Sequence, residues 1–232
     1  MAVSLDAYAT ASAQNTLANG ATFSFTNQTV GSGFSEALFV AVLDNSTAGT
    51  SFQVNWDTAG SNQLLTLIGS NAVTNVGNVF FYGLANATAG HKTLGVKRIA
   101  GATSSCDVFS VSLFGVDPLL TDWSANVSAG SGTSASSASL STTTTIGSYA
   151  FSAMMDISTT PTGPTGGTVR FGNDTLNSPG AVCRGADSFS ASSTVTHTYT
   201  LSPADNWVGL IVSIPFTTAV PLTLQQQTLM SM

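Results

Sequence analysis

Asp117 is the residue whose surroundings first suggest chemistry. It lies in residues 106–120, CDVFSVSLFGVDPLL, where an alternation of apolar and polar residues ends at Gly-Val-Asp-Pro. A catalytic carboxylate needs a second carboxylate, a histidine or a metal ion beside it, and Asp122 is the one such group that follows closely. A proline restricts the residue before it to extended or turn conformations, and an aspartate there caps the turn through its own side chain. We therefore predict that Asp117 turns the chain and has no catalytic role.

The other groups that carry out catalysis or bind metals are few and scattered. His91 and His197 are the only histidines, Glu36 is the only glutamate, and no HxH, HExxH, GxSxG, GxGxxG or P-loop pattern occurs. Zinc sites, nucleophile elbows and phosphate-binding loops each need such a spacing. Asp44 and Asp57 are weaker candidates for calcium, without the DxDxDG loop that would support them. We predict that the protein is not an enzyme and uses no cofactor or metal.

Cys106 and Cys183 are the only cysteines. A disulfide between them would close a long loop and would be worth about 4 kcal/mol in the chain-entropy model. Two free thiols in a reducing compartment fit the residue types equally well. The sequence leaves both alternatives open.

Tryptophan side chains are candidates for stacking on the apolar face of a sugar. Trp56 and Trp207 lie in or next to apolar runs, so we expect them in the core. Trp123 follows the Asp117 turn and is the candidate for an exposed glycan contact.

The composition excludes two classes of partner. Charged residues make up only 7% of the chain and hydrophobic residues 43%, whereas ordinary domains have about 25% charged residues. The net charge is −6 and only five residues are basic, so there is no cationic patch for phosphates. We therefore expect no nucleic-acid or membrane partner. A polar but nearly uncharged surface suits packing against neighbours in an assembly.

The N-terminus lacks the basic and apolar regions of a signal peptide, and no apolar run is long enough for a transmembrane helix. We expect a protein that is made in a host cytoplasm without a signal peptide and leaves the cell inside a particle. Secretion by a route that needs no signal peptide would also fit.

A hydrophobic period of two dominates the chain. ATFSFT, SFQVNW, CDVFSVSLF and TVTHTYTL alternate apolar and polar residues, whereas ALFVAVL, VFFYGL and WVGLIVSI are continuous apolar runs. Alternation is typical of half-buried strands, and short apolar runs are typical of strands buried on both faces. Turn residues recur every 8–12 positions, which indicates many short antiparallel strands. The pattern predicts an all-β sandwich, with only weak helix candidates at 11–18 and 222–229.

Two stretches have the composition of linkers, the Ser/Gly/Ala-rich residues 128–139 and the Pro/Gly-rich residues 158–167. We interpret both as surface loops, because the strands on either side each resemble half of a sandwich. The prediction is one domain over residues 1–216, followed by a C-terminal arm over residues 217–232. The arm is uncharged, and its candidate docking residues are Pro221, Leu222, Leu224, Leu229 and Met230. Docking on a neighbouring chain and packing on its own domain are equally compatible with the sequence.

VFFYGLANATAGHKTLGVKR at 79–98, FSVSLFGVDPLL at 109–120 and NWVGLIVSIPF at 206–216 together resemble a β-sandwich domain that recurs in phage-encoded and bacterial surface proteins. The resemblance covers about residues 35–216 and rests on strand and turn residues. It implies an antiparallel jelly-roll-like sandwich in a structural or adhesive role.

These observations predict a structural phage protein, a capsid decoration or head-fibre component on the virion surface. Its expected partners are the major capsid protein or another virion protein and its own copies, with a trimer as the first expectation. The alternative is a carbohydrate-binding or adhesin module of a tail fibre or surface protein. That module would bind host-surface glycans through Trp123 and residues 128–139.

Overall fold

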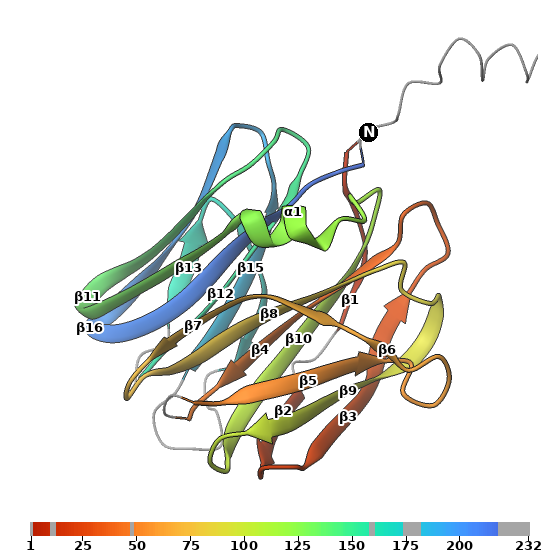
Figure 1. The fold of residues 1–232 in the computed structure, drawn as a ribbon. Coiled ribbons are helices and arrows are strands. Elements are labelled where there is room, and N and C mark those ends of the chain that lie inside the picture. Colours follow the sequence, from red (N-terminus) through yellow and green to blue (C-terminus); the bar gives the residue numbers. More distant parts are fainter. Residues whose placement is uncertain (1, 10–12, 47–48, 158–160, 174–181, 218–232) are drawn as a thin grey trace, which may run out of the picture.

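The computed structural model describes residues 2–9, 13–46, 49–157, 161–173 and 182–217 (Figure 1). In the first half of the chain the strands are β1 Ser4–Tyr8, β2 Ala13–Leu17, β3 Thr22–Val30, β4 Ala37–Asp44, β5 Ser51–Trp56, β6 Gln63–Leu64, β7 Thr66–Val73, β8 Gly77–Ala85, β9 Gly90–Ala100 and β10 Ser104–Phe114. The second half contains the helix α1 Leu120–Ala125 and the strands β11 Val127–Thr143, β12 Tyr149–Asp156, β13 Thr162–Thr165, β14 Thr168–Asn173, β15 Val182–Phe189 and β16 Thr194–Ile214. All strand pairs are antiparallel, so the predicted all-β class is confirmed.

The first half of the chain forms two facing sheets. The middle sheet has the order β1-β10-β4-β8-β7, with β2 also paired to β10, and the outer sheet has the order β3-β9-β5-β6. Successive strands alternate between these sheets, from β3 to β4 to β5 and from β8 to β9 to β10. Two four-stranded sheets linked in this way are the arrangement of a jelly roll. Here the outer sheet has four strands and the middle sheet has six, because β1 and β2 share one edge along β10 and β7 is added at the other edge. The predicted jelly-roll pattern is therefore present within residues 4–114.

The middle sheet is buried on both faces. Every residue of β4 is buried, and its side chains alternate between two cores. Phe39 belongs to the core on one side of the sheet, and Leu38 and Val40 belong to the core against the outer sheet. Because both faces of β4 pack against apolar cores, neither set of alternating side chains is polar. Residues 37–43 therefore form a continuous apolar run.

A third sheet, absent from the two-layer expectation, covers the other face of the middle sheet. Its order is β11-β16-β12-β15-β14, with β13 also paired to β16, and it lies opposite the outer sheet in Figure 1. The core between them centres on Phe151 of β12. Its ring lies 5.0 Å from that of Phe39 and stacks at 5.1 Å on that of Phe109. The ring of Phe109 stacks at 4.5 Å on that of Phe171.

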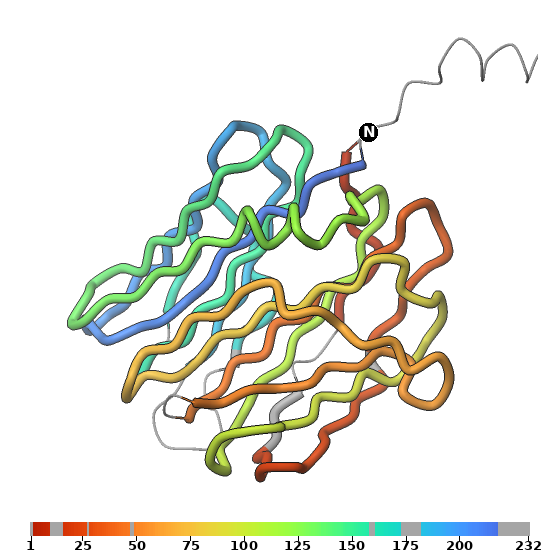
Figure 2. Tube along the Cα trace, in the orientation of Figure 1, coloured from red at the N-terminus to blue at the C-terminus, as the bar shows by residue number. Residues whose placement is uncertain are grey.

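β11 and β16 form a long ribbon that bends back over the outer face of the third sheet. The pairing register shifts between Gly132 and Ala135 and again before Ser137, and such irregularities bend a strand pair. Beyond the bend, Leu140 covers Gly130 and Gly209, where an added Cβ would lie 2.8 and 2.9 Å from its methyl groups. The tube in Figure 2 shows the ribbon returning on itself.

The bent ribbon corrects the interpretation of residues 128–139 as a surface loop, because all of them lie within β11. Small residues are needed there to let the two layers of the ribbon approach each other. Of residues 158–167, the segment 162–165 is strand β13, and 158–160 lie outside the described residues. The helix expected at 11–18 is also wrong where it is described, since residues 13–17 are strand β2 paired with β10. No helix in the described segments is long and apolar enough to cross a membrane.

Candidate functional site

Asp117 has the turn role predicted for it. Its Oδ1 accepts a hydrogen bond from the backbone N–H of Leu119 at 2.9 Å, which caps the turn before α1. Its backbone N–H donates to the carbonyl of Pro215 at 2.9 Å. Asp117 therefore fixes the end of β10 against the end of β16.

Trp123 is fully buried, which corrects its assignment as an exposed glycan contact. The short helix α1 places the indole on β8 over Gly83, where an added Cβ would lie 2.9 Å from the ring. The indole Nε1 donates to the carbonyl of Asp117 at 2.8 Å. With an exposed fraction of 0%, Trp123 presents no face to a sugar. Trp56 and Trp207 are also buried, as expected.

The two cysteines are free and buried. Cys106 belongs to the core against the outer sheet, whereas Cys183 belongs to the core between the middle and third sheets. Burial raises the pKa of Cys106 to about 12 and that of Cys183 well above its usual range. Both thiols are therefore protonated at neutral pH and serve as small apolar core residues.

His197 is enclosed beneath the bent ribbon, where β16 packs on β12 and β15. Its Nδ1 lies 2.7 Å from the hydroxyl of Ser152, and its Nε2 lies 2.9 Å from the hydroxyl of Ser188. Burial lowers the pKa of His197 to about 4. A serine beside a histidine resembles part of a nucleophilic pair, but His197 is 0% exposed and Gly167 lies against its Nε2. No substrate reaches this pair in the described structure.

The aspartates proposed for calcium are engaged in other interactions. Asp44 forms a fully buried ion pair with Arg98. Asp57 accepts hydrogen bonds from the N–H and the hydroxyl of Ser61, both at 2.9 Å, and pairs with Lys92 at 3.4 Å. Within the described segments, no group of three or more His, Cys, Asp or Glu residues has the geometry to hold a metal ion.

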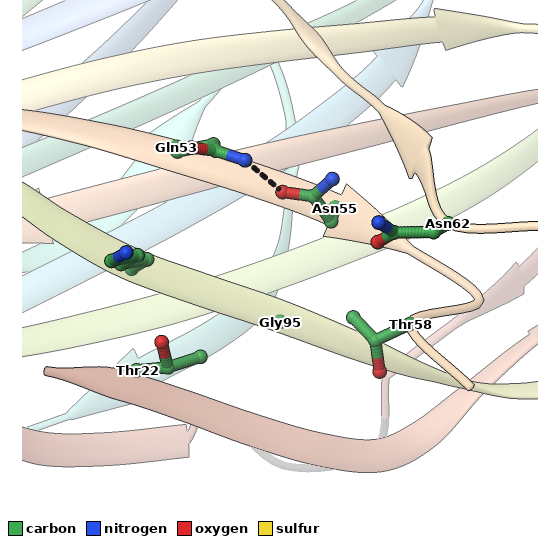
Figure 3. A pocket seen from close by; sticks show the side chains of 7 residues that line it. Thr22, Gln53, Asn55, Thr58, Asn62 and Gly95 are labelled. Carbon is green, nitrogen blue, oxygen red and sulfur yellow. Dashed lines mark hydrogen bonds between the residues drawn. The ribbon is translucent and has the colours of Figure 1, made fainter.

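A small polar pocket of about 120 Å³ opens on the exposed face of the outer sheet (Figure 3). It is lined by Thr22, Gln53, Asn55, Thr58, Asn62, Gly95 and Lys97. Gln53 donates from Nε2 to Oδ1 of Asn55 at 2.9 Å. The pocket is smaller than the roughly 300 Å³ at which small-molecule sites usually begin, and no aromatic residue lines it. It offers hydrogen bonds but little apolar contact.

A larger apolar pocket lies at the end of the molecule where both ends of the described chain meet. It has a volume of about 400 Å³ and is lined by Ala2, Ser4, Gly33, Phe34, Phe114 and Gly115; these six residues are called the apolar pocket below. Phe34 is 62% exposed. The ends of the described chain are close together in Figure 2, and a Cβ added at Gly147 would lie within 4 Å of both Ala2 and Phe216.

The wall of the apolar pocket is fixed by hydrogen bonds behind it. The N–H of Gly31 donates to the carboxylate of Asp6 at 2.7 Å, and the N–H of Gly33 donates to that of Glu36. Both glycines lie so close to the ring of Phe114 that an added Cβ would meet it within 2.7 Å. These contacts hold the loop that contains Gly31 and Gly33 against the ring of Phe114, while the side chain of Phe34 is exposed.

Two further apolar side chains are exposed in neighbouring loops at this end. Ile146 is 66% exposed and precedes Gly147, whose carbonyl accepts a hydrogen bond from the N–H of Val3 at 3.0 Å. Leu119 is 58% exposed and follows the Asp117 turn. The apolar pocket, Leu119 and Ile146 together are called the apolar end. Clustered exposed apolar side chains of this kind mark interaction surfaces.

Sequence analysis did not identify the apolar end. Phe34 stands alone in GSGFSE, between two strands, and a single phenylalanine among small residues has no periodic pattern. The one available signal is its setting, because a large aromatic residue in a turn made of Gly and Ser has no strand neighbour to cover it. Phe114 and Leu119 come from one other segment and Ile146 from a second, and only the fold brings these segments to the same end as Phe34.

No protein-family model matches the chain, and no curated protein matches it. Solved structures with some likeness include the PBSX exported protein XepA, at 7% identity and a TM-score of 0.29 over 91% of this chain and 86% of that one. Cucumber necrosis virus aligns at 11% identity and a TM-score of 0.28 over 94% and 92%. The CBM22 tandem domain of Paenibacillus barcinonensis Xyn10C aligns at 13% identity and a TM-score of 0.29 over 97% and 87%. Similarity at this level assigns the chain to no family.

Proposed function

We propose that the protein is a non-enzymatic structural component of a phage virion, a capsid decoration or head-fibre protein that attaches through the apolar end. The observation that carries this proposal is the apolar pocket with its exposed Phe34, at the point where the described chain ends. A solvent-exposed apolar cluster on a rigid sandwich is suited to burial against another protein surface.

The charge distribution supports an assembly role. Of the five basic residues, Arg98 is buried against Asp44, and Arg170 and Lys92 are paired with Asp187 and Asp57. A surface with few free charges pays little desolvation free energy when it packs against a neighbour. The partners in this proposal are the major capsid protein or another virion protein, and further copies of this chain.

The C-terminal arm is part of the proposed attachment. Its candidate docking residues Pro221, Leu222, Leu224, Leu229 and Met230 lie outside the described residues. A chain that ends at Thr217 keeps every described strand, so we expect it to fold with an unchanged circular dichroism spectrum. We expect this truncated chain to be absent from particles that incorporate the full-length chain, as measured by mass spectrometry of purified particles. Incorporation of both chains at the same ratio would contradict a role for the arm in attachment.

Carbohydrate binding is a second candidate function, favoured by the polar pocket of the outer sheet. Amide and hydroxyl side chains such as Gln53, Asn55 and Thr22 are suited to hydrogen bonding with sugar hydroxyls. The measurement is affinity electrophoresis in gels that contain host-surface polysaccharide. Retardation that is lost in Gln53→Ala but kept in Thr26→Ala, an exposed residue outside the pocket, would support this function. Equal mobility with and without polysaccharide would exclude it.

A further inference from the structure

We propose that the apolar pocket receives the C-terminal segment, residues 218–232, of a second copy of this chain. This inference deepens the proposed function, because it names the partner of one part of the apolar end. It concerns the purified protein alone and does not depend on a capsid.

The pocket has the chemistry of a site for an apolar peptide. Its lining carries two aromatic rings, from Phe34 and Phe114, and no charged side chain. Asp6 and Glu36 behind the wall are occupied by backbone N–H groups of the same loop. A pocket of about 400 Å³ has room for a few aliphatic side chains, and its wall is formed before any partner arrives.

The C-terminal segment has the complementary chemistry. It has 15 residues, none of them charged, and includes Leu222, Leu224, Leu229 and Met230. It begins at the rim of the pocket, since the N–H of Thr217 donates to the carbonyl of Gly115 at 2.9 Å. Burial of this many aliphatic side chains away from water is favourable, and the apolar pocket offers an apolar surface on which they can be buried.

The sequence after Thr217 favours a second copy over the chain's own pocket. Because Thr217 is bonded to Gly115 in the pocket rim, the segment would have to reverse direction at once to enter the same pocket. Residues 218–221 are Thr-Ala-Val-Pro, with no Gly, Asn or Asp to form a tight turn. A proline also disfavours the helical region for the residue before it, so the sequence before Pro221 favours an extended chain. A chain extended from residue 217 to residue 222 would span about 16 Å, which is enough to pass its own pocket and reach a neighbour.

When each copy places its C-terminal segment in the apolar pocket of another copy, every pocket binds the same segment. Such reciprocal contacts close a symmetric oligomer without any free pocket. No pocket would then remain open to further copies, because every pocket is filled once the ring of copies is closed.

The direct test is a disulfide between two different chains. A Ser4→Cys chain and a Leu222→Cys chain, carrying tags of different size, are co-expressed, purified and oxidised. Ser4 lines the pocket and is exposed, and the native cysteines are buried. We expect a disulfide-linked heterodimer on a non-reducing gel. The matched control replaces Ser4→Cys with Leu64→Cys, an exposed position on β6 outside the pocket, and should give no heterodimer.

Two outcomes would overturn the inference. A monomeric internal disulfide in the double variant Ser4→Cys/Leu222→Cys, with no heterodimer in the mixture, would show that the segment fills its own pocket. The absence of any disulfide in both experiments would show that the segment does not enter the pocket. Neither outcome would contradict the proposed attachment to a particle, which is tested separately by measuring incorporation of the chain into particles.

The oligomeric state provides an independent readout. We expect the full-length chain to be oligomeric in light scattering coupled to size-exclusion chromatography, and both Phe34→Ser and the chain ending at Thr217 to be monomeric. Ile99→Ser removes an exposed apolar side chain of β9 outside the pocket and should leave the oligomer intact. A monomeric full-length chain at high concentration would overturn the inference.

Discussion

His197 is held between the bent ribbon and the third sheet by two hydroxyl groups. The hydroxyl of Ser152, which bonds to Nδ1 of His197, also bonds to the hydroxyl of Tyr199 at 2.7 Å, and Ser188 lies at Nε2 of His197. The nearby carboxylate of Asp187 favours the protonated imidazole, but desolvation has the larger effect. The ring is therefore neutral in the folded state at all but acidic pH.

The neutral burial of His197 makes the protein less stable in mild acid. The pKa of His197 is about 4 in the folded state, against 6.5 for the free group. Above pH 6.5 neither state binds the proton, but between pH 6.5 and 4 the unfolded chain binds it and the folded chain does not. The free energy of unfolding should fall by about 3 kcal/mol over this range from His197 alone.

Urea unfolding at pH 7 and pH 4 measures this effect. We expect the wild type to lose about 3 kcal/mol more than His197→Gln between the two pH values, because the variant lacks the titrating group. Equal losses in the two proteins would contradict the assignment of His197 as a buried neutral residue.

The ion pair of Arg98 and Asp44 is fully buried, with both side chains at 0% exposure. The guanidinium also lies 4.8 Å from the ring centre of Phe52. In Arg98→Met, Asp44 would lose its countercharge, and we expect a loss of about 3–5 kcal/mol in the free energy of unfolding. Adding Asp44→Asn to this variant should recover part of the loss, as measured by urea unfolding. An equal or greater loss in the double variant would contradict an uncompensated charge as the cause.

At the scale of elements, the third sheet is joined to the middle sheet through the aromatic rings around Phe151. β12 carries this ring between β4, β8 and β10, which contribute Phe39, Phe81 and Phe109. The close stacking of Phe171 against β15 also requires Gly185, where an added Cβ would lie 1.8 Å from the ring. These contacts fix how the second half of the chain sits on the first.

Phe151→Ala should therefore be among the most destabilising single changes. We expect a loss of about 3–5 kcal/mol in the free energy of unfolding, because the removed ring leaves a cavity between two sheets. Leu64→Ala, at a residue that is 59% exposed, should change it by less than about 0.5 kcal/mol. Similar losses in the two variants would show that the rings do not hold the sheets together.

The strands follow from the sequence more directly than the layers do. Alternating and continuous apolar runs predict β4, β8, β10 and β16, because a period of two is a local property. The serines of β10 show where the prediction of burial from this alternation fails. Ser110 and Ser112 stand on the polar side of an alternating run, yet both are buried and donate to Gln28 and Asp6 at 2.7 Å. Local alternation cannot reveal a second covering layer that supplies its own polar partners.

The candidate site follows from the sequence even less. Trp123 follows a turn, where an exposed residue is expected. Its indole is buried because Gly83, on a distant strand, has no side chain to occupy that space. Phe34 and Phe114 stand about 80 residues apart and meet only in the folded chain. Asp117 was predictable because the proline that sets its role is its neighbour.

At the scale of the whole molecule, the two halves of the chain build different layers. Residues 4–114 form the jelly roll, and residues 127–214 form the sheet that covers it. The face of the middle sheet that carries Phe39, Phe81 and Phe109 is buried only because the third sheet lies on it. The jelly roll is therefore incomplete without the second half of the chain.

A fragment of residues 1–118 tests this dependence. We expect it to expose the apolar face of the middle sheet, and so to bind a hydrophobic dye and aggregate. The full-length chain under the same conditions is the control. A monomeric fragment that does not bind the dye and unfolds in one cooperative transition would show that the jelly roll is self-sufficient.

The proposed role of this chain as a structural part of a virion is tested most directly by where the chain is found in its native source. A lysate is separated on a density gradient, and the fractions are analysed by quantitative mass spectrometry. We expect the chain to sediment with dense particles, in a fixed ratio to one abundant protein that would be its capsid partner. A chain that stays at the top of the gradient with the free proteins would contradict the claim and make carbohydrate binding the leading function.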